Sequence, residues 1–167
     1  MKSYISPKTK KGLLSKIHGL GFFAIKPIRK GEVVAIKKGH FLTKEQIKKL
    51  GMRLHDYLRI DDDLYVGHNS KKEFNDTEVF INHSCSPNTR LKGKVTVIAI
   101  KNIKRDEEIV IDYATWVDDN SLMKCNCHSV NCRKVITGKD WKKPQLQKRY
   151  KGFFTPFVQK KIELNRF

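Results

Sequence analysis

Hydrophobic side chains between about residues 12 and 115 occur in short runs bounded by glycine, proline, asparagine or clusters of charged residues. Each run is about four residues long and rich in β-branched or aromatic side chains, a pattern typical of short β-strands rather than helices. The predicted strands are 22–25, 33–36, 57–60, 64–66, 95–100 and 109–111. Residues 92–94, with a central glycine, and residues 104–108 are predicted turns.

One helical pattern interrupts these strands. Thr43 is a predicted N-cap, and Gln46 stands three residues later, at the spacing of a capping box. Ile47, Leu50 and Leu54 follow at helical intervals. The sequence therefore predicts a helix over about residues 43–54.

A second helix is predicted to begin at Pro144, because proline is favoured in the first turn of a helix. It would place Leu146 and Tyr150 on one face, ahead of an aromatic stretch at 153–157 that we expect to line the core or a cleft. Residues 158–164 are predicted to add a last turn or two. The predicted fold class is mostly β with short helices, followed by a cysteine-rich segment and a helical tail.

The length of 167 residues fits one domain of ordinary size with a small appendage. With 39% hydrophobic residues the chain can form a core, so wholesale disorder is not expected. No run of eighteen apolar residues is present, which argues against a membrane-spanning helix. The first residues lack the apolar stretch of a secretory signal, and an intracellular location is therefore expected.

The net charge of +18 is unevenly distributed. Residues 1–60 carry 15 basic against 3 acidic side chains, and residues 120–167 carry 12 against 2, whereas residues 61–119 carry 8 against 12. Basic ends indicate either contact with a polyanion such as nucleic acid or solubility through self-repulsion. The acidic middle indicates a cationic substrate.

The chain has four cysteines, of which Cys125, Cys127 and Cys132 lie within eight residues and Cys85 lies forty residues earlier. Four thiolates are what a tetrahedral structural zinc site requires, and sulfur ligands favour zinc over magnesium or calcium. The alternatives are two disulfides or unpaired thiols; disulfides need an oxidising compartment, and a bond between Cys125 and Cys127 would be strained. His128 could replace one sulfur, but we expect it to be exposed and leave it out of the site.

His83 and Cys85 also stand close enough in sequence to suggest a nucleophilic cysteine–histidine pair. The sequence offers no third group to orient them, however, and a cysteine that binds metal is not free to attack a substrate. The zinc interpretation is therefore favoured.

Four motifs and the cysteine-rich segment together resemble the SET-domain lysine methyltransferases. The motifs are residues 19–24 (GLGFFA), 28–34 (IRKGEVV), 80–88 (FINHSCSPN) and 107–113 (EEIVIDY), and the post-SET-like cysteines follow. The resemblance covers about residues 12–138. It divides the chain into a SET domain at 12–115, a post-SET-like zinc segment at 120–138 and a helical tail at 139–167.

The resemblance implies the SET-domain fold, small β-sheets around a knot-like threading in which the segment ending at Tyr113 passes beneath the loop containing Asn82 and His83. It implies S-adenosylmethionine as methyl donor and one structural zinc, with Cys85 as the fourth zinc ligand. By similarity, the cofactor-binding residues are Gly19, Leu20, Gly21, Phe22, Asn82, His83 and Tyr113. Tyr113 is the expected catalytic residue, and the expected substrate-binding residues are Ile111, Tyr113 and Trp116.

The sequence departs from many relatives at several positions. Residues 37–40 (KKGH) replace a Tyr-x-Gly-Glu stretch, so another tyrosine, Tyr57 or Tyr65, is expected to line the lysine channel. Ile111 stands where many relatives have phenylalanine or tyrosine, and Val79 where many have arginine. The sequence has no cysteine-rich pre-SET segment, and in this respect the chain resembles a minimal, stand-alone member of the family. These departures affect substrate and methylation degree rather than the cofactor site.

The expected substrate is a lysine side chain of a basic protein, histone-like or ribosomal, steered by carboxylates of the acidic middle. These are Asp61, Asp62, Asp63, Glu73, Asp76, Glu78, Asp118 and Asp119. In the alternative interpretation, they merely offset neighbouring lysines. A rival function is an inactive basic zinc-containing module that binds nucleic acid or chromatin. The location would be nuclear or chromatin-associated, or cytoplasmic in a bacterial host.

Overall fold

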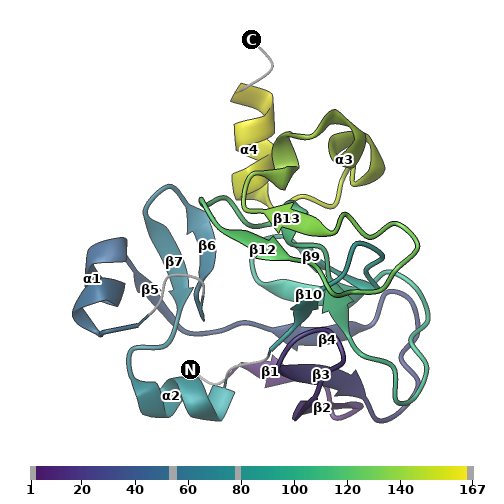
Figure 1. Ribbon diagram of the computed structural model, residues 1–167. Coiled ribbons are helices and arrows are strands. Elements are labelled where there is room, and N and C mark those ends of the chain that lie inside the picture. Colours follow the sequence, from purple (N-terminus) through teal and green to yellow (C-terminus); the bar gives the residue numbers. More distant parts are fainter. Residues whose placement is uncertain (1–2, 53–55, 78–79, 165–167) are drawn as a thin grey trace.

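The computed structural model describes residues 3–52, 56–77 and 80–164 (Figure 1). Its largest sheet has six strands in the order β1-β4-β10-β9-β11-β8. The strands, listed in that order, are β1 (Tyr4–Ile5), β4 (Val33–Ile36), β10 (Thr96–Ala99), β9 (Thr89–Lys92), β11 (Val110–Ile111) and β8 (Asn82–His83). Most pairs are antiparallel, but β11 runs parallel to both of its neighbours.

Three smaller sheets surround this one. β2 (Thr9–Leu14) pairs with β3 (Leu20–Ala24), and β12 (Leu122–Lys124) pairs with β13 (Val135–Thr137). The third sheet has the order β5-β7-β6, with β5 at His40–Leu42, β6 at Leu58–Asp61 and β7 at Leu64–Gly67. In Figure 1 it projects to one side together with α1 (Lys44–Lys49), while α3 (Pro144–Arg149) and α4 (Pro156–Leu164) lie beyond β12 and β13.

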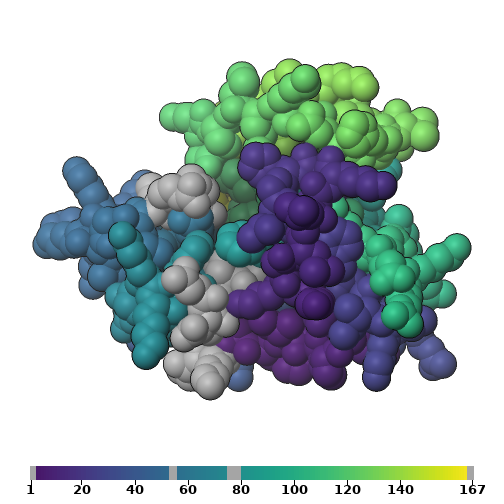
Figure 2. Space-filling model, turned by 60° about the horizontal axis from the view of Figure 1, so that its bottom comes forward, coloured from purple at the N-terminus to yellow at the C-terminus, as the bar shows by residue number. Residues whose placement is uncertain are grey.

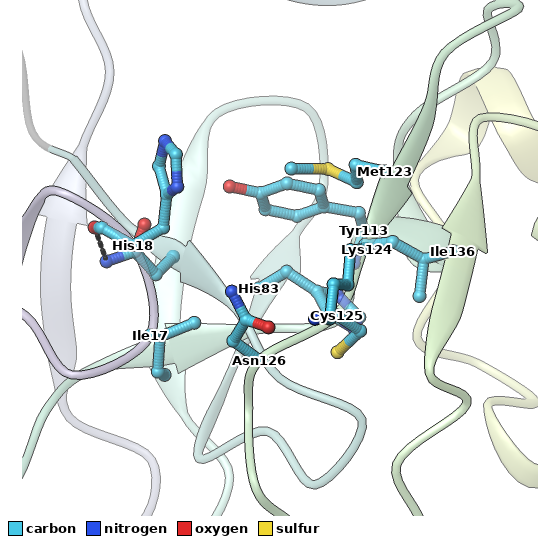
Figure 3. Close-up of a pocket in the computed structure, with 10 residues that line it drawn as sticks. Ile17, His18, His83, Tyr113, Met123, Lys124, Cys125, Asn126 and Ile136 are labelled. Atoms are coloured by element: carbon cyan, nitrogen blue, oxygen red, sulfur yellow. Dashed lines mark hydrogen bonds between the residues drawn. The ribbon is translucent and has the colours of Figure 1, made fainter.

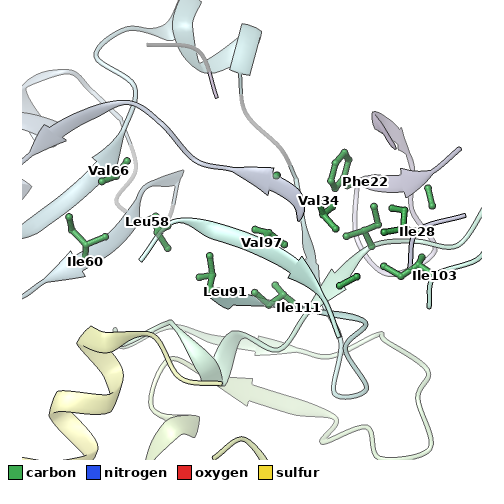
Figure 4. Packing of buried hydrophobic residues seen from close by; sticks show 14 residues of the cluster. Phe22, Ile28, Val34, Leu58, Ile60, Val66, Leu91, Val97, Ile103 and Ile111 are labelled. Atoms are coloured by element: carbon green, nitrogen blue, oxygen red, sulfur yellow. The ribbon is translucent and has the colours of Figure 1, made fainter. Parts of the chain in front are cut away.

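The main hydrophobic core lies between the six-stranded sheet, β3 and the inner side of β6 and β7 (Figure 4). Phe22, Val34 and Ile109 are fully buried in it. Ile28 and Ile103 form an isolated antiparallel bridge and pack at one end of this core. Burial of these apolar surfaces is the main force that holds the short strands together, because two-residue strands contribute few backbone hydrogen bonds of their own.

The parallel pairing of β11 with β8 and β9 positions the residues around Tyr113. Ser84 donates its backbone N–H to the carbonyl oxygen of Ile111 (3.0 Å), and Asn88 donates to that of Val110 (3.3 Å). The backbone of Val110 donates in turn to the Asn88 side-chain oxygen (2.8 Å). The segment leading to Tyr113 is therefore held against the loop of residues 82–88 by hydrogen bonds.

The predicted helices are present. Thr43 caps α1 in a complete capping box with Gln46, but the helix ends at Lys49 and Gly51 follows with a positive φ of 65°, so the predicted continuation is wrong at residues 50–52. Leu54 lies outside the described residues. α3 begins at Pro144 and buries Leu146 and Tyr150 against Ala114, as expected. The expected turn or two at 158–164 is the larger part of α4, which starts earlier, at Pro156.

All six predicted strands and both predicted turns are found within about two residues of their expected positions. Several short elements escape sequence analysis, including β8, β9 and α2 (Lys71–Thr77). β9 (TRLK) has a single apolar residue and so no hydrophobic pattern that stands out, and its register with β10 depends on tertiary packing. Within the described part of the chain, no helix has the length and apolar character needed to cross a membrane.

Candidate active site

A pocket lies where the β2–β3 turn approaches the segment around β12 (Figure 3). Ile17 and His18 form one wall, and the backbone region from Met123 to Asn126 forms the other. Between these two walls lie Asn82 and His83 of β8, and Tyr113, which follows β11. The full lining is Ile17, His18, Asn82, His83, Tyr113, Met123, Lys124, Cys125, Asn126 and Ile136.

Three of the seven expected cofactor residues line this pocket, namely Asn82, His83 and Tyr113. Residues 19–22 do not; the two residues just before them, Ile17 and His18, do. Phe22 is fully buried in the core, and its carbonyl oxygen accepts a hydrogen bond from the Ile109 backbone N–H (2.7 Å). Sequence analysis also missed Met123, Lys124 and Asn126, which stand beside the metal-ligand candidates without a motif of their own.

The Asn82 side chain is fixed by an unusually complete set of acceptors. Its Nδ2 donates to the carbonyl oxygens of His18 (3.0 Å) and Leu20 (3.2 Å) and to Oε1 of Glu108 (2.8 Å). The Ser15 hydroxyl donates to the same Glu108 carboxylate (2.8 Å). With the amide nitrogen occupied in this way, the side-chain oxygen is left to accept a hydrogen bond from a ligand.

Glu108 explains why position 21 is glycine. A Cβ added to Gly21 would lie 2.6 Å from Glu108 Oε1, which no side chain tolerates without displacing the carboxylate. The β2–β3 turn thus approaches Glu108 closely because Gly21 lacks a side chain. Glu108 stands inside one of the quoted motifs, yet its role depends on contacts with residues far away in sequence.

Tyr113 opens a single 3-10 turn, η2 (Tyr113–Thr115), whose N-cap Asp112 accepts a hydrogen bond from the Ala114 backbone (3.0 Å). The Tyr113 hydroxyl donates to the carbonyl oxygen of Ile81 (3.1 Å). In Figure 3 its ring lies between His18 and Met123. Burial, assisted by the nearby negative charge of Glu108, raises the pKa of Tyr113 to about 12, so the phenol stays neutral at physiological pH.

His83 and Cys85 do come together, but burial disfavours a charge on either group while no metal is bound. His83 Nδ1 accepts the Tyr113 backbone N–H (3.2 Å), so its proton is on Nε2, which lies 3.3 Å from Cys85 Sγ. Burial lowers the pKa of His83 to about 4 and raises the pKa of Cys85 to about 11. A thiolate–imidazolium nucleophile is therefore disfavoured, in agreement with the sequence interpretation.

The four cysteine sulfurs converge on one point. All lie within 4.8 Å of one another, and Cys85 Sγ is 3.9 Å from Cys125 Sγ. Four sulfurs at about 2.3 Å from a tetrahedral zinc would be about 3.8 Å apart. All four are free thiols, so the disulfide alternative finds no support, and the donor set fits zinc.

Backbone N–H groups surround these sulfurs and would stabilise thiolates. Arg133 donates to Cys85 Sγ (3.3 Å), Cys85 to Cys127 Sγ (3.5 Å) and Lys134 to Cys132 Sγ (3.4 Å). The positive φ of 64° at Lys134 aims that last donor. Such hydrogen bonds lower the energy of thiolate ligands, as outer-shell partners of metal sites do.

The expected substrate-binding residues do not all lie in the same place. Tyr113 and Trp116 lie together, with ring centroids 5.6 Å apart. The Trp116 Nε1 is buried without a hydrogen-bond partner among the described residues. Ile111 is 3% exposed, packs in the core and does not line the pocket, so the structure gives no support to the substrate contact expected of it.

Neither proposed replacement for the channel tyrosine lies near Tyr113. Tyr57 and Tyr65 are buried in a separate cluster with Leu42 and Ile47, and the Tyr57 hydroxyl donates to the carbonyl oxygen of His68 (2.8 Å). Both are held there by the packing of α1 on the β5-β7-β6 sheet. The departure at Val79 lies outside the described residues.

The acidic middle is largely engaged with its own protein. Asp118 is 7% exposed and forms ion pairs with Lys139 (2.7 Å) and Lys161 (3.3 Å), so its assignment to a substrate-facing surface is wrong. Asp62 also pairs with Lys161 (3.1 Å). Both fit the alternative that these acids offset nearby cations. Glu78 and the Asp76 side chain lie outside the described residues.

Comparison with known proteins gives a coherent result. A family model described as the SET domain matches residues 19–114. The histone-lysine N-methyltransferase trithorax of Drosophila virilis is 30% identical over 136 residues, covering 73% of this chain and 3% of that protein. The H3 lysine-4 specific histone-lysine N-methyltransferase of Schizosaccharomyces pombe is 30% identical over 137 residues, covering 73% and 14%. A humanized Polycomb Repressive Complex 2 of Chaetomium thermophilum, bound to an inhibitor, is 22% identical, with a TM-score of 0.48 and coverage of 63% and 14%.

Proposed function

The chain belongs to the SET-domain family, and from this premise we propose that it is an S-adenosylmethionine-dependent protein-lysine N-methyltransferase. The observation that carries the proposal is the placement of a neutral Tyr113 hydroxyl at a pocket that Asn82 and His83 also line. The chain covers at most 14% of the length of the relatives compared above, so the activity of those proteins is a proposal here.

The pocket residues fit the methyl donor. Asn82 presents a side-chain oxygen that no described protein donor uses, which suits an ammonium group, and the Lys124 cation suits a carboxylate. When bound, S-adenosylmethionine supplies a methyl group already activated by its sulfonium charge. Ile17, Met123 and Ile136 add apolar surface that excludes water.

Tyr113 would align the substrate amine. Its neutral hydroxyl donates to Ile81, which leaves oxygen lone pairs to accept a hydrogen bond from the lysine nitrogen. A free lysine has a pKa of about 10.4, and a dry site lowers it toward the neutral, nucleophilic form. Alignment of reacting groups is worth about 7–11 kcal/mol in favourable cases, so the protein needs no further acid or base to explain catalysis.

The proposed substrate is a basic protein, histone-like or ribosomal. The relatives named above are histone-lysine methyltransferases by description, which supports this class. A histone substrate would imply a place at chromatin. The Trp116 indole N–H, buried without a described partner, would then hydrogen-bond an acceptor on the substrate.

Replacement of Tyr113 by phenylalanine tests the proposal. We expect the rate of radiolabelled methyl transfer to histones or lysate proteins to fall at least about 100-fold, because loss of alignment has costs of this order. Binding of S-adenosylmethionine, measured by calorimetry, should change little. Equal rates for the two proteins would refute the role given to this hydroxyl.

A second candidate function, nucleic-acid binding, is supported by one surface. The bridge between Ile28 and Ile103 brings two cationic segments side by side, which appear dark blue and green in Figure 2. We call this the basic surface; its exposed members are Lys26, Arg29, Lys30, Lys101, Lys104 and Arg105. Like charges placed opposite one another are unfavourable, and a polyanion would relieve the repulsion.

Thermal shift separates the two functions. S-adenosylmethionine at a hundred times its dissociation constant would add about 2.7 kcal/mol of stability to an active methyltransferase. Absence of that shift, together with salt-sensitive binding to DNA or RNA, would favour the inactive binding module. A thermal shift with S-adenosylmethionine together with salt-sensitive binding to DNA or RNA would describe an enzyme that docks on nucleic acid near its substrate.

A further inference from the structure

Arg133 occupies an unusual position between the cysteine cluster and Tyr113. Its backbone N–H donates to Cys85 Sγ (3.3 Å). Its guanidinium donates through Nη1 and Nη2 to both oxygens of Asp112 (2.7 and 2.8 Å), and through Nε to Asp140 (2.9 Å). One residue therefore touches a metal-ligand sulfur and the carboxylate that immediately precedes Tyr113.

Asp112 carries this contact to Tyr113. Its side chain is fully buried, and its Oδ1 accepts the Ala114 N–H that starts the η2 turn. Its Oδ2 accepts the Tyr150 hydroxyl (2.8 Å). Tyr113 is the first residue of that turn, so the Asp112 carboxylate acts on the position of Tyr113 together with the hydrogen bonds that Tyr113 makes to His83 and Ile81.

The C-terminal tail contributes two residues to this network, Asp140 to Arg133 and Tyr150 to Asp112. Asp140, also fully buried, accepts from Arg133, from Thr137 Oγ1 (3.1 Å) and from Lys143 (2.7 Å). Asp140 and Tyr150 lie beyond residues 19–114, the region that matches the family model. Two buried carboxylates, one at the Nη1–Nη2 end and one at Nε of the same planar guanidinium, fix its orientation in a way that a lysine ammonium cannot.

We propose that Arg133 is a positioning residue that couples the four-cysteine site to Tyr113, with Asp140 and Tyr150 of the tail as its supports. The part that concerns turnover rests on the proposed methyltransferase function. Metal in the cysteine site fixes the Arg133 backbone, the Arg133 side chain fixes Asp112, and Asp112 fixes the turn that carries Tyr113. The zinc segment thereby acts on the catalytic position and not only on the stability of the chain.

The test uses the full chain in three variants. Arg133→Lys keeps the charge but loses the forked hydrogen bonds, and Tyr150→Phe removes a single hydroxyl from Asp112. Lys151→Gln is the matched control, because it removes a cation adjacent to Tyr150 whose side chain is exposed. Zinc content, zinc release to a chromogenic chelator, binding of S-adenosylmethionine and turnover are measured for each.

For Tyr150→Phe we expect one zinc per chain, binding of S-adenosylmethionine within about twofold of wild type, and kcat lower by at least about tenfold, because a displacement of about 1 Å can cost about 100-fold. Arg133→Lys should show the same loss of kcat and release zinc about tenfold faster, as outer-shell variants of metal sites do. Lys151→Gln should match wild type in every measurement.

The position of Tyr113 can also be followed by NMR spectroscopy, which does not require the protein to be enzymatically active. The chain has two tryptophans, so the indole N–H region of an NMR spectrum holds two signals, and Trp116→Phe identifies that of Trp116. Because Trp116 packs edge-on against Tyr113, its signal should move in Tyr150→Phe and Arg133→Lys and stay in place in Lys151→Gln.

Wild-type kcat in both test variants, with the Trp116 signal unmoved, would overturn the proposal. So would a fall in affinity for S-adenosylmethionine that matches the fall in kcat, since that indicates a damaged pocket. If the wild type transfers no methyl group, the proposed function fails instead, while zinc release and the Trp116 signal still decide whether the two sites are coupled.

Discussion

At the scale of single residues, Glu108 controls how Asn82 faces the pocket. Replacing Glu108 by alanine removes the only charged one of the three acceptors of Asn82 Nδ2 (2.8 Å) and so weakens the hold on this amide, which keeps the carbonyl oxygens of His18 and Leu20. A hydrogen bond to a charged group is worth about 1.5–3 kcal/mol. We therefore expect the dissociation constant for S-adenosylmethionine, measured by calorimetry, to rise at least about tenfold.

Glu108→Gln is the matched comparison. Glutamine retains an oxygen that can accept from Asn82 and from Ser15, so most of the affinity should be preserved in this variant. Glutamine and alanine variants that bind the methyl donor equally well, at wild-type affinity, would show that Glu108 serves only the packing of the β2–β3 turn.

At the scale of elements, Asp118 joins the tail to the body of the protein. Its carboxylate accepts from the Trp141 indole (2.9 Å) and pairs with Lys139, with Lys161 of α4 and with Arg59 of β6. Asp118→Ala leaves the buried indole N–H unsatisfied and three cations without their shared anion. We expect the free energy of unfolding, from urea titration at pH 7, to fall by about 2–3 kcal/mol. A change below about 0.5 kcal/mol would contradict this role.

The same contact predicts a pH dependence. Burial alone would raise the pKa of Asp118, but hydrogen bonds from Lys139 and Trp141 outweigh it and hold the pKa below the ordinary 3.8. A carboxylate of this kind stabilises the fold above pH 3.8 and loses its contribution as the pH falls through the lower folded-state pKa. Between pH 5 and the acid limit, about pH 2, wild type should therefore lose more stability than Asp118→Asn. Parallel curves would contradict the prediction, because any acid release of metal affects both proteins.

The β12–β13 hairpin and its cysteines form the next unit. We expect about one zinc per chain in metal analysis under reducing conditions, because four sulfur ligands complete a tetrahedral site. Removal of zinc by a chelator should increase amide exchange over residues 120–137 while leaving the six-stranded sheet protected, since the main core is separate from the cysteine cluster. Less than about half a zinc per chain would favour unmetallated thiols.

At the scale of the whole molecule, the net charge of +18 makes any binding of nucleic acid strongly dependent on salt. If the basic surface makes the contact, reversing Lys30 and Lys101 to glutamate should remove about two phosphate contacts. The slope of log affinity against log salt would then fall by about 2 units, because each contact contributes about 0.9.

Lys44→Glu with Lys48→Glu is the control for this prediction. These exposed residues of α1 change the net charge by the same amount at a different place. Equal losses of slope in both double variants would mean that nucleic acid responds to total charge rather than to the basic surface. An unchanged slope in Lys30→Glu with Lys101→Glu would also exclude the surface.

The sequence by itself determined the features that depend on local order and spacing. The capping box of α1, the start of α3 at Pro144 and the short β-branched strands follow from contacts between near neighbours, which a linear pattern records. The four cysteines and Tyr113 were identifiable because metal chemistry and the family motifs restrict residue type at those positions. The composition likewise indicated a basic chain with enough apolar residues for one core.

Tertiary structure alone decided which of those residues meet. Asn82 reaches Glu108 across 26 positions, and Arg133 reaches Asp112 across 21, by routes set by the parallel pairing of β11 and the docking of the tail. The same packing buries Ile111 in the core and Asp118 among cations, where sequence analysis expected substrate contacts. A side chain's partners depend on which faces of distant elements are buried together, and that information is distributed over the whole chain rather than stored in any one motif.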